Sequence, residues 1–174
     1  MLDEAAIKKE KINKKGSYKK VFSFIHKPEY IIKTWDDRTD SLVKEEYETS
    51  KKYPNLFASI PKINWDKRWM IQEKLNTDQV EKELNELINL LAIPYPNQVI
   101  KRLQSMMDDK DRVKNFLEFI ENVSLIDVKK TQLLVLRWLK FLKEVDKIDT
   151  VDSKDINHGN MGYDKNGNLK LLDI

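Results

Sequence analysis

Three polar residues near the end of the sequence have the types and spacing of a magnesium site. Asp155 precedes Asn160 by five residues, in a segment too tight for a continuous helix, and Asp173 follows a predicted hairpin that turns at Asn166-Gly167. Because a hairpin returns the chain to its starting point, we expect Asn160 and Asp173 to lie close together. Mg²⁺ binds a few carboxylate or amide oxygens and leaves its other positions to water and substrate phosphates. The pattern therefore predicts a magnesium site that works with a phosphate-bearing substrate.

The same residues resemble the catalytic core of the protein-kinase-like superfamily, which includes protein kinases and aminoglycoside phosphotransferase-like proteins. There an Asp is followed five residues later by an Asn and thirteen beyond that by the metal-binding Asp, as here. The resemblance implies that Asp155 accepts the proton of an attacking hydroxyl or orients it, and that Asn160 and Asp173 hold Mg²⁺. The structural alternative is that Asp155 caps a turn and Asn160 is an ordinary loop residue. That alternative does not explain both spacings together.

A second part of the resemblance lies near the start of the sequence, where Gly16, Ser17 and Val21 stand between two strand-like segments. In the superfamily, a glycine-rich loop covers the ATP phosphates there, since backbone amides approach phosphate closely only where side chains are small. Here one glycine is kept, and Lys19 stands where the family usually has another. Lys33 resembles the strand lysine that pairs with the α- and β-phosphates. An exposed strand lysine is the alternative, but the following acidic helix favours the phosphate-binding interpretation.

A glutamate on that following helix should hold Lys33 in place, and Glu46 stands about where similar proteins carry theirs. Glu45 and Glu48 remain alternatives, because adjacent residues point about 100° apart on a helix and the sequence alone does not phase it. For the glutamates that do not face Lys33, we expect solvated pairing with lysines one helical turn away.

The segment 69–75 resembles the last strand of the N-terminal lobe as it enters the hinge. In the superfamily, the backbone there binds the adenine edge, which implies this role for Glu73 and Leu75. Gln72 would then stand at the gatekeeper position. The assignment rests on the place of this segment in the order of the elements.

Some residues depart from the family pattern and leave the activity open. Ser153-Lys154 replaces the His-Arg that precedes the aspartate in many protein kinases, and Asn157 replaces a lysine or histidine that assists phosphate transfer. The sequence ends at Ile174, before the activation segment and the helices that bind a protein substrate. Two functions are therefore carried forward: an ATP- and Mg²⁺-dependent phosphotransferase acting on a hydroxyl, and a pseudokinase, which is a nucleotide-binding regulatory or interaction module without turnover. The acceptor stays open.

Hydrophobic periodicity and turn residues predict an order of elements that fits the same superfamily. Strands are expected at 21–25, 30–35, 60–65 and 69–72, and helices at 40–53, from the cap at 76–78 through 91, and at 98–107, 111–121 and 131–145. The last helix is apolar around so much of its circumference that we expect it to be buried. The resemblance implies a two-lobed α+β fold, with a small antiparallel sheet and helix at residues 1–75 and a shortened helical lobe with the catalytic hairpin at 76–174.

Composition excludes several other classes of protein. The 174 residues, 40% of them hydrophobic, suffice for one core or two small lobes, while 35% charged residues and the absence of a long apolar run argue against a membrane span. Without cysteine there is no disulfide framework. The lysine-rich start lacks the apolar stretch of a secretory signal, so a cytoplasmic location is expected. A net charge of +3 does not demand nucleic-acid binding, and the lysine run at 8–20 is expected to be a solvated face, although a small basic interaction protein is a distant alternative.

The end of the sequence also predicts an interaction surface. Leu169, Leu171, Leu172 and Ile174 would form an edge strand with little chain left to cover it. An uncovered apolar edge favours pairing with another chain. We therefore expect a protein partner or a homo-oligomer at this strand.

Overall fold

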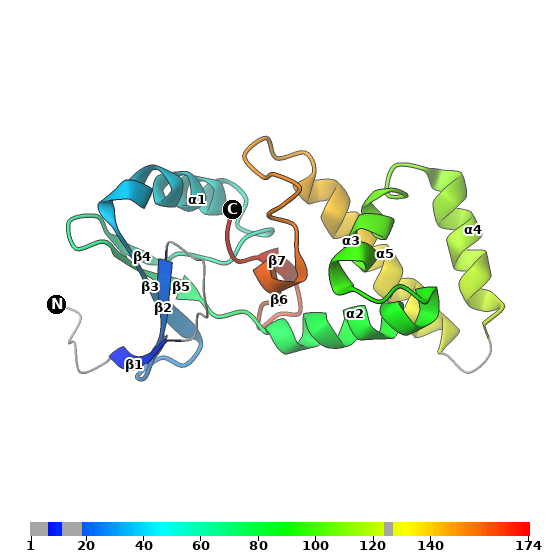
Figure 1. Cartoon of the computed structure of the whole chain (residues 1–174), viewed down its shortest axis with the longest axis horizontal. Coiled ribbons are helices and arrows are strands. Elements are labelled where there is room, and N and C mark those ends of the chain that lie inside the picture. Colours follow the sequence, from blue (N-terminus) through cyan, green and yellow to red (C-terminus); the bar gives the residue numbers. More distant parts are fainter. Residues whose placement is uncertain (1–6, 12–18, 124–126) are drawn as a thin grey trace. The chain divides into compact units, whose positions relative to one another are not determined.

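The computed structural model describes residues 7–11, 19–123 and 127–174 (Figure 1). The chain forms two compact units, of which the first comprises Met1–Asn76 and Gly162–Ile174 and the second comprises Thr77–Met161. The combination of a small antiparallel sheet with helices confirms the α+β class. The division after Asn76 lies one residue from the predicted one. Residues 162–174, however, belong to the first unit, which corrects their predicted assignment to the helical lobe.

Within the described residues of the first unit, five strands form one antiparallel sheet in the order β1-β2-β3-β5-β4. The hairpins predicted around residues 26–29 and 66–68 are both present, with one strand at 30–35 as predicted and the ends of the other three within two residues of the predicted ones. The strands are β1 (Ile7–Lys11), β2 (Lys19–Phe24), β3 (Tyr30–Trp35), β4 (Lys62–Asn64) and β5 (Trp69–Glu73).

Helix α1 (Asp40–Lys52) packs its buried side against the sheet (Figure 1). A single 3-10 turn (Asp37–Thr39) precedes it, capped by the Asp36 carboxylate, which accepts a hydrogen bond from the Arg38 amide at 3.1 Å. The apolar core between helix and sheet contains Trp35, Val43, Ile60 and Met70. Val43 and Glu46 are both buried, because residues three apart share a helix face. The core therefore sets which glutamate of α1 faces the sheet.

The predicted hairpin near the end of the chain is present as β6 (Met161–Tyr163) and β7 (Leu169–Leu171). Its turn is closed by the Asp164 carboxylate, which accepts hydrogen bonds from the amides of Asn166 at 2.9 Å and Asn168 at 2.8 Å. Gly167 has φ of 80°, in the left-handed region that glycine adopts without strain. The Asn-Gly turn signal thus acts as the sequence predicts.

The prediction of an uncovered edge at β7 is wrong. Leu169 and Leu171 are buried, Leu172 and Ile174 are half-buried, and the backbone of segment 56–58 pairs with β7 at Leu171. The amide of Leu171 donates to the carbonyl of Leu56 at 2.8 Å, and the amide of Ala58 donates to the carbonyl of Leu171 at 2.8 Å. A partner at this surface stays a prediction, but an uncovered β7 edge does not support it.

Replacing Gly162 by alanine is expected to lower the free energy of unfolding by about 1 to 3 kcal/mol, the usual cost of overpacking. An added Cβ would lie 2.5 Å from the Cβ of Leu75 and 3.3 Å from the backbone of Asn76. Urea unfolding followed by circular dichroism measures the change. Gly159→Ala is the matched control, because its Cβ would meet only the Asn157 side chain at 3.4 Å, and its stability should change by less than about 1 kcal/mol. Equal stabilities for the two variants would contradict the steric argument.

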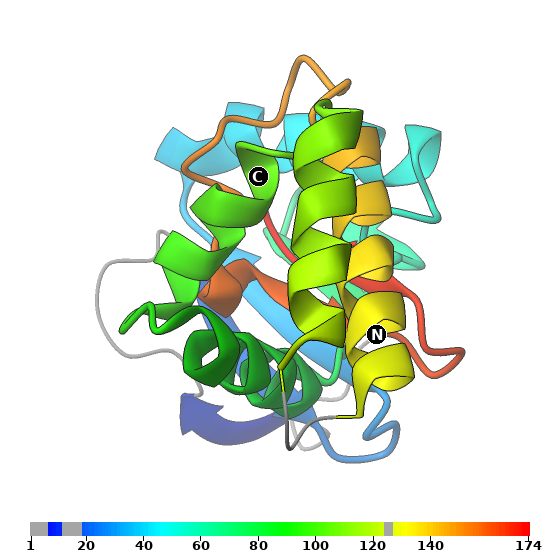
Figure 2. The same cartoon turned by 90° about the vertical axis from the view of Figure 1, so that its right-hand side faces the viewer.

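The second unit is helical within its described residues, with α4 and α5 side by side (Figure 2). Pro96 begins a helix instead of only ending the previous one, because proline is tolerated at the first helical position. Aromatic and aliphatic side chains of α5 are buried on one face of the helix. Leu133 and Leu136, however, are 59% and 42% exposed, so the prediction that this helix is buried all round is wrong. The helices are α2 (Thr77–Leu91), α3 (Pro96–Gln104), α4 (Lys110–Glu121) and α5 (Val128–Val145).

Glu83 of α2 joins that helix to α5. Its carboxylate accepts hydrogen bonds from Arg137 at 2.6 Å and from the Trp138 indole at 3.0 Å. Trp138 is fully buried, so its N–H needs an acceptor inside the unit. None of the helices in the described ranges is both long and apolar enough to cross a bilayer.

Candidate functional site

Three polar side chains occupy the same face of neighbouring strands in the first unit. Lys33 on β3 lies opposite Val21 on β2, so Lys19, two residues before Val21, shares its face. Gln72 on β5 lies opposite Ile31, which shares the Lys33 face by the same alternation. The pairing register thus brings Lys19, Lys33 and Gln72 to the face of the sheet that α1 covers.

The Glu46 carboxylate accepts hydrogen bonds from all three of these side chains. The Lys33 Nζ lies 3.4 Å from one carboxylate oxygen, to which the Gln72 amide also donates at 3.3 Å. Lys19 donates to the other oxygen. Glu46 is 1% exposed, whereas Glu45 and Glu48 are exposed to solvent. The structure therefore pairs Lys33 with Glu46, the residue chosen from the sequence.

Asp173 completes the group from the far end of the chain. Its Oδ1 accepts from Lys33 at 2.6 Å and from Lys19 at 2.9 Å. The preceding carbonyl of Leu172 accepts from Lys33 at 3.2 Å and from Gln72 at 2.9 Å. We call Lys19, Lys33, Glu46 and Asp173 the lysine–carboxylate cluster. Three of its side chains are buried, but the Asp173 side chain is 38% exposed, so the cluster contacts solvent at that residue.

The charges of the lysine–carboxylate cluster balance when all four groups are ionised. Burial raises the pKa of Glu46, against the opposing effect of the ammonium groups. Burial alone would also raise the pKa of Asp173, but the Lys33 and Lys19 ammonium groups outweigh it and hold that pKa well below its usual range. For Lys19, burial lowers the pKa, and the Glu46 and Asp173 carboxylates more than compensate and raise it. Asp173 and Lys19 are therefore charged at neutral pH.

Gln72 contributes an unsatisfied acceptor beside this cluster. Its amide nitrogen donates to Glu46 and to the Leu172 carbonyl, which sets the orientation of the side chain. Its Oε1 is buried and has no hydrogen-bond partner within the part of the chain that the structure describes. Because an unpaired buried acceptor costs free energy, this oxygen marks a place where a donor would be stabilising.

Asp155 and Asn160 lie together in a hydrogen-bonded loop of the second unit. The Asn160 side chain donates to the carbonyl of Asp155 at 2.9 Å, and the Asp155 carboxylate accepts from the amide of Asp152 at 3.0 Å. Asn157 caps the 3-10 turn His158–Asn160 by accepting from the Gly159 amide at 3.1 Å. The turn-forming alternative is thus realised for Asp155, and this does not exclude a catalytic role, since its carboxylate is only partly buried.

The predicted ligands Asn160 and Asp173 belong to the second and the first unit, respectively, so their pairing stays a prediction. Among residues 7–11, 19–123 and 127–174, no three or more His, Cys, Asp or Glu side chains form a group suited to a metal ion. Gly16 and Ser17 lie outside the described residues. Val21 is half-buried on β2, directly opposite Lys33.

At the predicted hinge, most backbone amides are already engaged. The Glu73 amide donates to the Ser59 carbonyl at 2.8 Å, and the Lys74 and Asn76 amides donate to Glu29 and Tyr163. The Leu75 amide between them donates to none of the residues that the structure describes. The Glu73 amide is therefore already satisfied within the first unit, whereas the Leu75 amide is available as a donor, and the adenine-binding role of both residues stays a prediction.

Lys19 is the residue of the cluster that sequence reasoning missed. The sequence pattern places it at a loop position where the family has a glycine, whereas it begins strand β2 and donates to Glu46 of α1. Strand alternation places it on the face of Val21, but that signal is useful only once the pairing with Lys33 is known.

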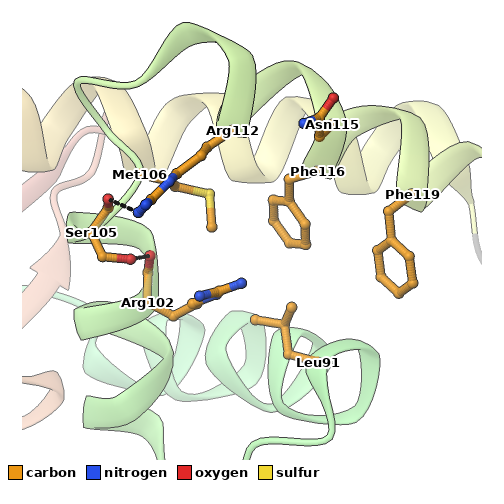
Figure 3. A pocket seen from close by; sticks show the side chains of 8 residues that line it. All are labelled: Leu91, Arg102, Ser105, Met106, Arg112, Asn115, Phe116 and Phe119. Atoms are coloured by element: carbon orange, nitrogen blue, oxygen red, sulfur yellow. Dashed lines mark hydrogen bonds between the residues drawn. The ribbon is translucent and has the colours of Figure 1, made fainter.

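A hollow of about 620 Å³ lies within the helical unit, between α4 and the ends of α2 and α3 (Figure 3). Phe116 and Phe119 project from α4 into it, with ring centroids 6.2 Å apart and nearly parallel planes. Arg112 donates to the carbonyl of Ser105 at 3.3 Å, and Arg102 supplies a second guanidinium group. Because this lining holds two cationic groups and no carboxylate, the hollow disfavours a metal ion.

Comparisons with known proteins add no assignment to this geometry. No protein-family model matches the chain, and a search of curated proteins finds no match either. The lysine–carboxylate cluster and the loop of Asp155 and Asn160 therefore carry the functional interpretation.

Proposed function

We propose that this chain binds ATP with Mg²⁺ and transfers the γ-phosphate to a hydroxyl group, in a two-lobed protein-kinase-like fold. The observation that carries the proposal is the buried Lys33, held between Glu46 of α1 and Asp173. Burying an ammonium group is costly unless it is paired, and a paired, oriented lysine beside a partly exposed carboxylate is suited to binding phosphate. Lys33 and Glu46 are 13 positions apart, whereas Asp173 lies 140 positions from Lys33.

The order of the elements supports the same proposal. A strand hairpin, helix α1, a second hairpin, four helices and the hairpin β6–β7 follow one another within the described residues, as the resemblance implies. The Leu75 amide and the Gln72 Oε1 offer a hydrogen-bond donor and an acceptor next to β5. These groups are suited to the polar edge of a nucleobase.

Asp173 offers one carboxylate, and Mg²⁺ takes one or two protein oxygens and completes its shell with water and phosphate. We assign its binding to Asp173 and, from the sequence spacing, to Asn160. Bound Mg²⁺ would offset the negative charge of the phosphates. Lys33 would contact the phosphates, Glu46 would orient Lys33, and Asp155 would orient the acceptor hydroxyl and receive its proton.

A second candidate is a nucleotide-binding module without turnover. It is favoured by the Asp155 carboxylate, which already accepts a hydrogen bond from Asp152, and by Asn157, which caps a turn where the family has a residue that assists phosphate transfer. The two candidates share nucleotide binding and differ only in turnover.

ATP is expected to raise the melting temperature of the wild-type chain, and to do so more strongly with Mg²⁺ than without it, because a ligand that binds the native state stabilises it. Lys33→Ala should weaken ATP binding by about 1 to 3 kcal/mol, the usual scale for a charge-assisted contact. Thermal-shift titration provides both measurements, with Lys27→Ala, an exposed turn lysine, as the control. If millimolar ATP leaves the wild-type melting temperature unchanged, both candidate functions are wrong.

Asp173→Ala is expected to abolish the part of ATP affinity that depends on Mg²⁺, and any transfer activity with it, because the metal loses its carboxylate ligand. Calorimetric titration with ATP, in Mg²⁺ and in EDTA, measures the difference between the two conditions. Asp164→Ala is not a suitable control, since that carboxylate closes the β6–β7 turn, so we choose the exposed Asp152→Ala. A variant that keeps the full Mg²⁺ dependence would remove Asp173 from the proposed metal site.

A further inference from the structure

We infer that Lys19 is a second phosphate-binding residue of this site, and that Glu46 and Asp173 hold its ammonium group in place before phosphate binds. The inference rests on the proposed function and extends it to a residue that the sequence resemblance does not assign. It identifies the ligand class as a polyphosphate, whose adjacent negative charges can face two ammonium groups.

Lys19 is directed into the site by the strand pleat. It is 9% exposed although it is a lysine, whereas its neighbour Lys20 on the opposite face is exposed to solvent. Its Nζ lies 2.9 Å from Asp173 Oδ1 and donates to Glu46. Lysines are seldom buried unless they are paired, and both carboxylates of the cluster pair with Lys19.

The two ammonium groups are close neighbours. Lys19 and Lys33 both donate to the same oxygen, Asp173 Oδ1, at 2.9 Å and 2.6 Å. Like charges at this separation repel, so the arrangement depends on the negative charge of the two carboxylates. If either carboxylate is neutralised or binds another cation, the site is left with an excess of positive charge.

Binding of a metal ion by Asp173 would create that excess. A carboxylate that coordinates Mg²⁺ is a weaker acceptor for two ammonium groups, which would then face Glu46 alone. One ammonium charge would be left without a counter-charge in a buried setting, which is unfavourable. Phosphate oxygens would supply the missing negative charge, and Lys19 and Lys33 are both positioned to meet them.

A purely structural Lys19 is the competing explanation, because one lysine could not neutralise both carboxylates. The two explanations differ in which ligand's affinity depends on Lys19. A phosphate-binding Lys19 strengthens binding of ATP and has no effect on adenosine, whereas a structural Lys19 affects both ligands equally through the shape of the site.

The test compares adenosine with Mg·ATP in isothermal titrations of the full chain. Lys19→Met keeps the length of the side chain and removes its charge, and it is expected to weaken Mg·ATP binding roughly 10- to 100-fold, the scale of a lost charge-assisted hydrogen bond. Adenosine affinity should change less than about twofold. Lys20→Met is the matched control on the opposite face and should leave both affinities unchanged. Lys33→Met should lower the affinity for Mg·ATP and leave the affinity for adenosine unchanged.

The outcomes separate this inference from the proposed function. If Lys33→Met weakens Mg·ATP binding but Lys19→Met does not, or if Lys19→Met weakens adenosine and Mg·ATP equally, the inference is wrong and the proposed function stands. If the wild-type chain binds no Mg·ATP, the proposed function is wrong and the inference fails with it. Should Lys19→Met not fold, Lys19→Gln keeps a donor for Glu46 without the charge and allows the same comparison.

Discussion

Asp155→Asn is expected to lower the rate of phosphoryl transfer roughly 10²- to 10⁴-fold while leaving ATP affinity nearly unchanged, the usual signature of a lost general base. The amide has the shape of the carboxylate but does not accept a proton. The contact from the Asn160 side chain uses the backbone carbonyl of Asp155, and the amide oxygen of the variant can still accept from the Asp152 amide. The loop should therefore keep its structure, and the loss should be confined to turnover.

The measurement is phosphate transfer or ATP hydrolysis beside ATP binding, for the wild type and Asp155→Asn. Asp152→Asn is a matched control, because its side chain lies in the same turn and has no assigned chemical role. If the wild type binds Mg·ATP but turns over no faster than Asp155→Asn, the assigned chemistry is wrong, and the nucleotide-binding module without turnover takes its place.

Glu46→Ala is expected to lower the free energy of unfolding by about 3 to 5 kcal/mol, because it removes one partner of a buried ionic group. Lys33 is 2% exposed and Lys19 is 9% exposed, so both would be left with the partly exposed Asp173 as their remaining carboxylate. The Gln72 amide would also lose one of its acceptors. The expected loss therefore exceeds that of a surface substitution by several kcal/mol.

Urea unfolding of the full chain measures this effect. Glu45→Ala and Glu48→Ala lie on the solvent side of the same helix and should change stability by no more than about 0.5 kcal/mol. A Glu46→Ala variant as stable as these two controls would show that the lysine–carboxylate cluster contributes no net stability.

The strands and turns of the first unit are largely predictable from sequence because their signals are local. A run of aromatic and β-branched residues identifies β3, and the Asn166-Gly167 pair identifies the hairpin between β6 and β7. The limits of α3 were less predictable, because the proline at 96 is compatible with either ending or beginning a helix. The assignment of 162–174 to the wrong unit has another cause, since it depends on pairing with Asn76 and with segment 56–58.

The sequence by itself determined the residue types for phosphate chemistry and their spacing, including Lys33, Glu46 and Asp173 as members of one predicted site. Only the tertiary structure decided that Glu46, and neither of its neighbours, faces Lys33, since the packing of Val43 sets the rotation of α1. It also placed Lys19 against Asp173, a contact across 154 positions of sequence. Such a contact depends on strand register and on the return of the chain end to the sheet, and no local pattern of residues encodes either one.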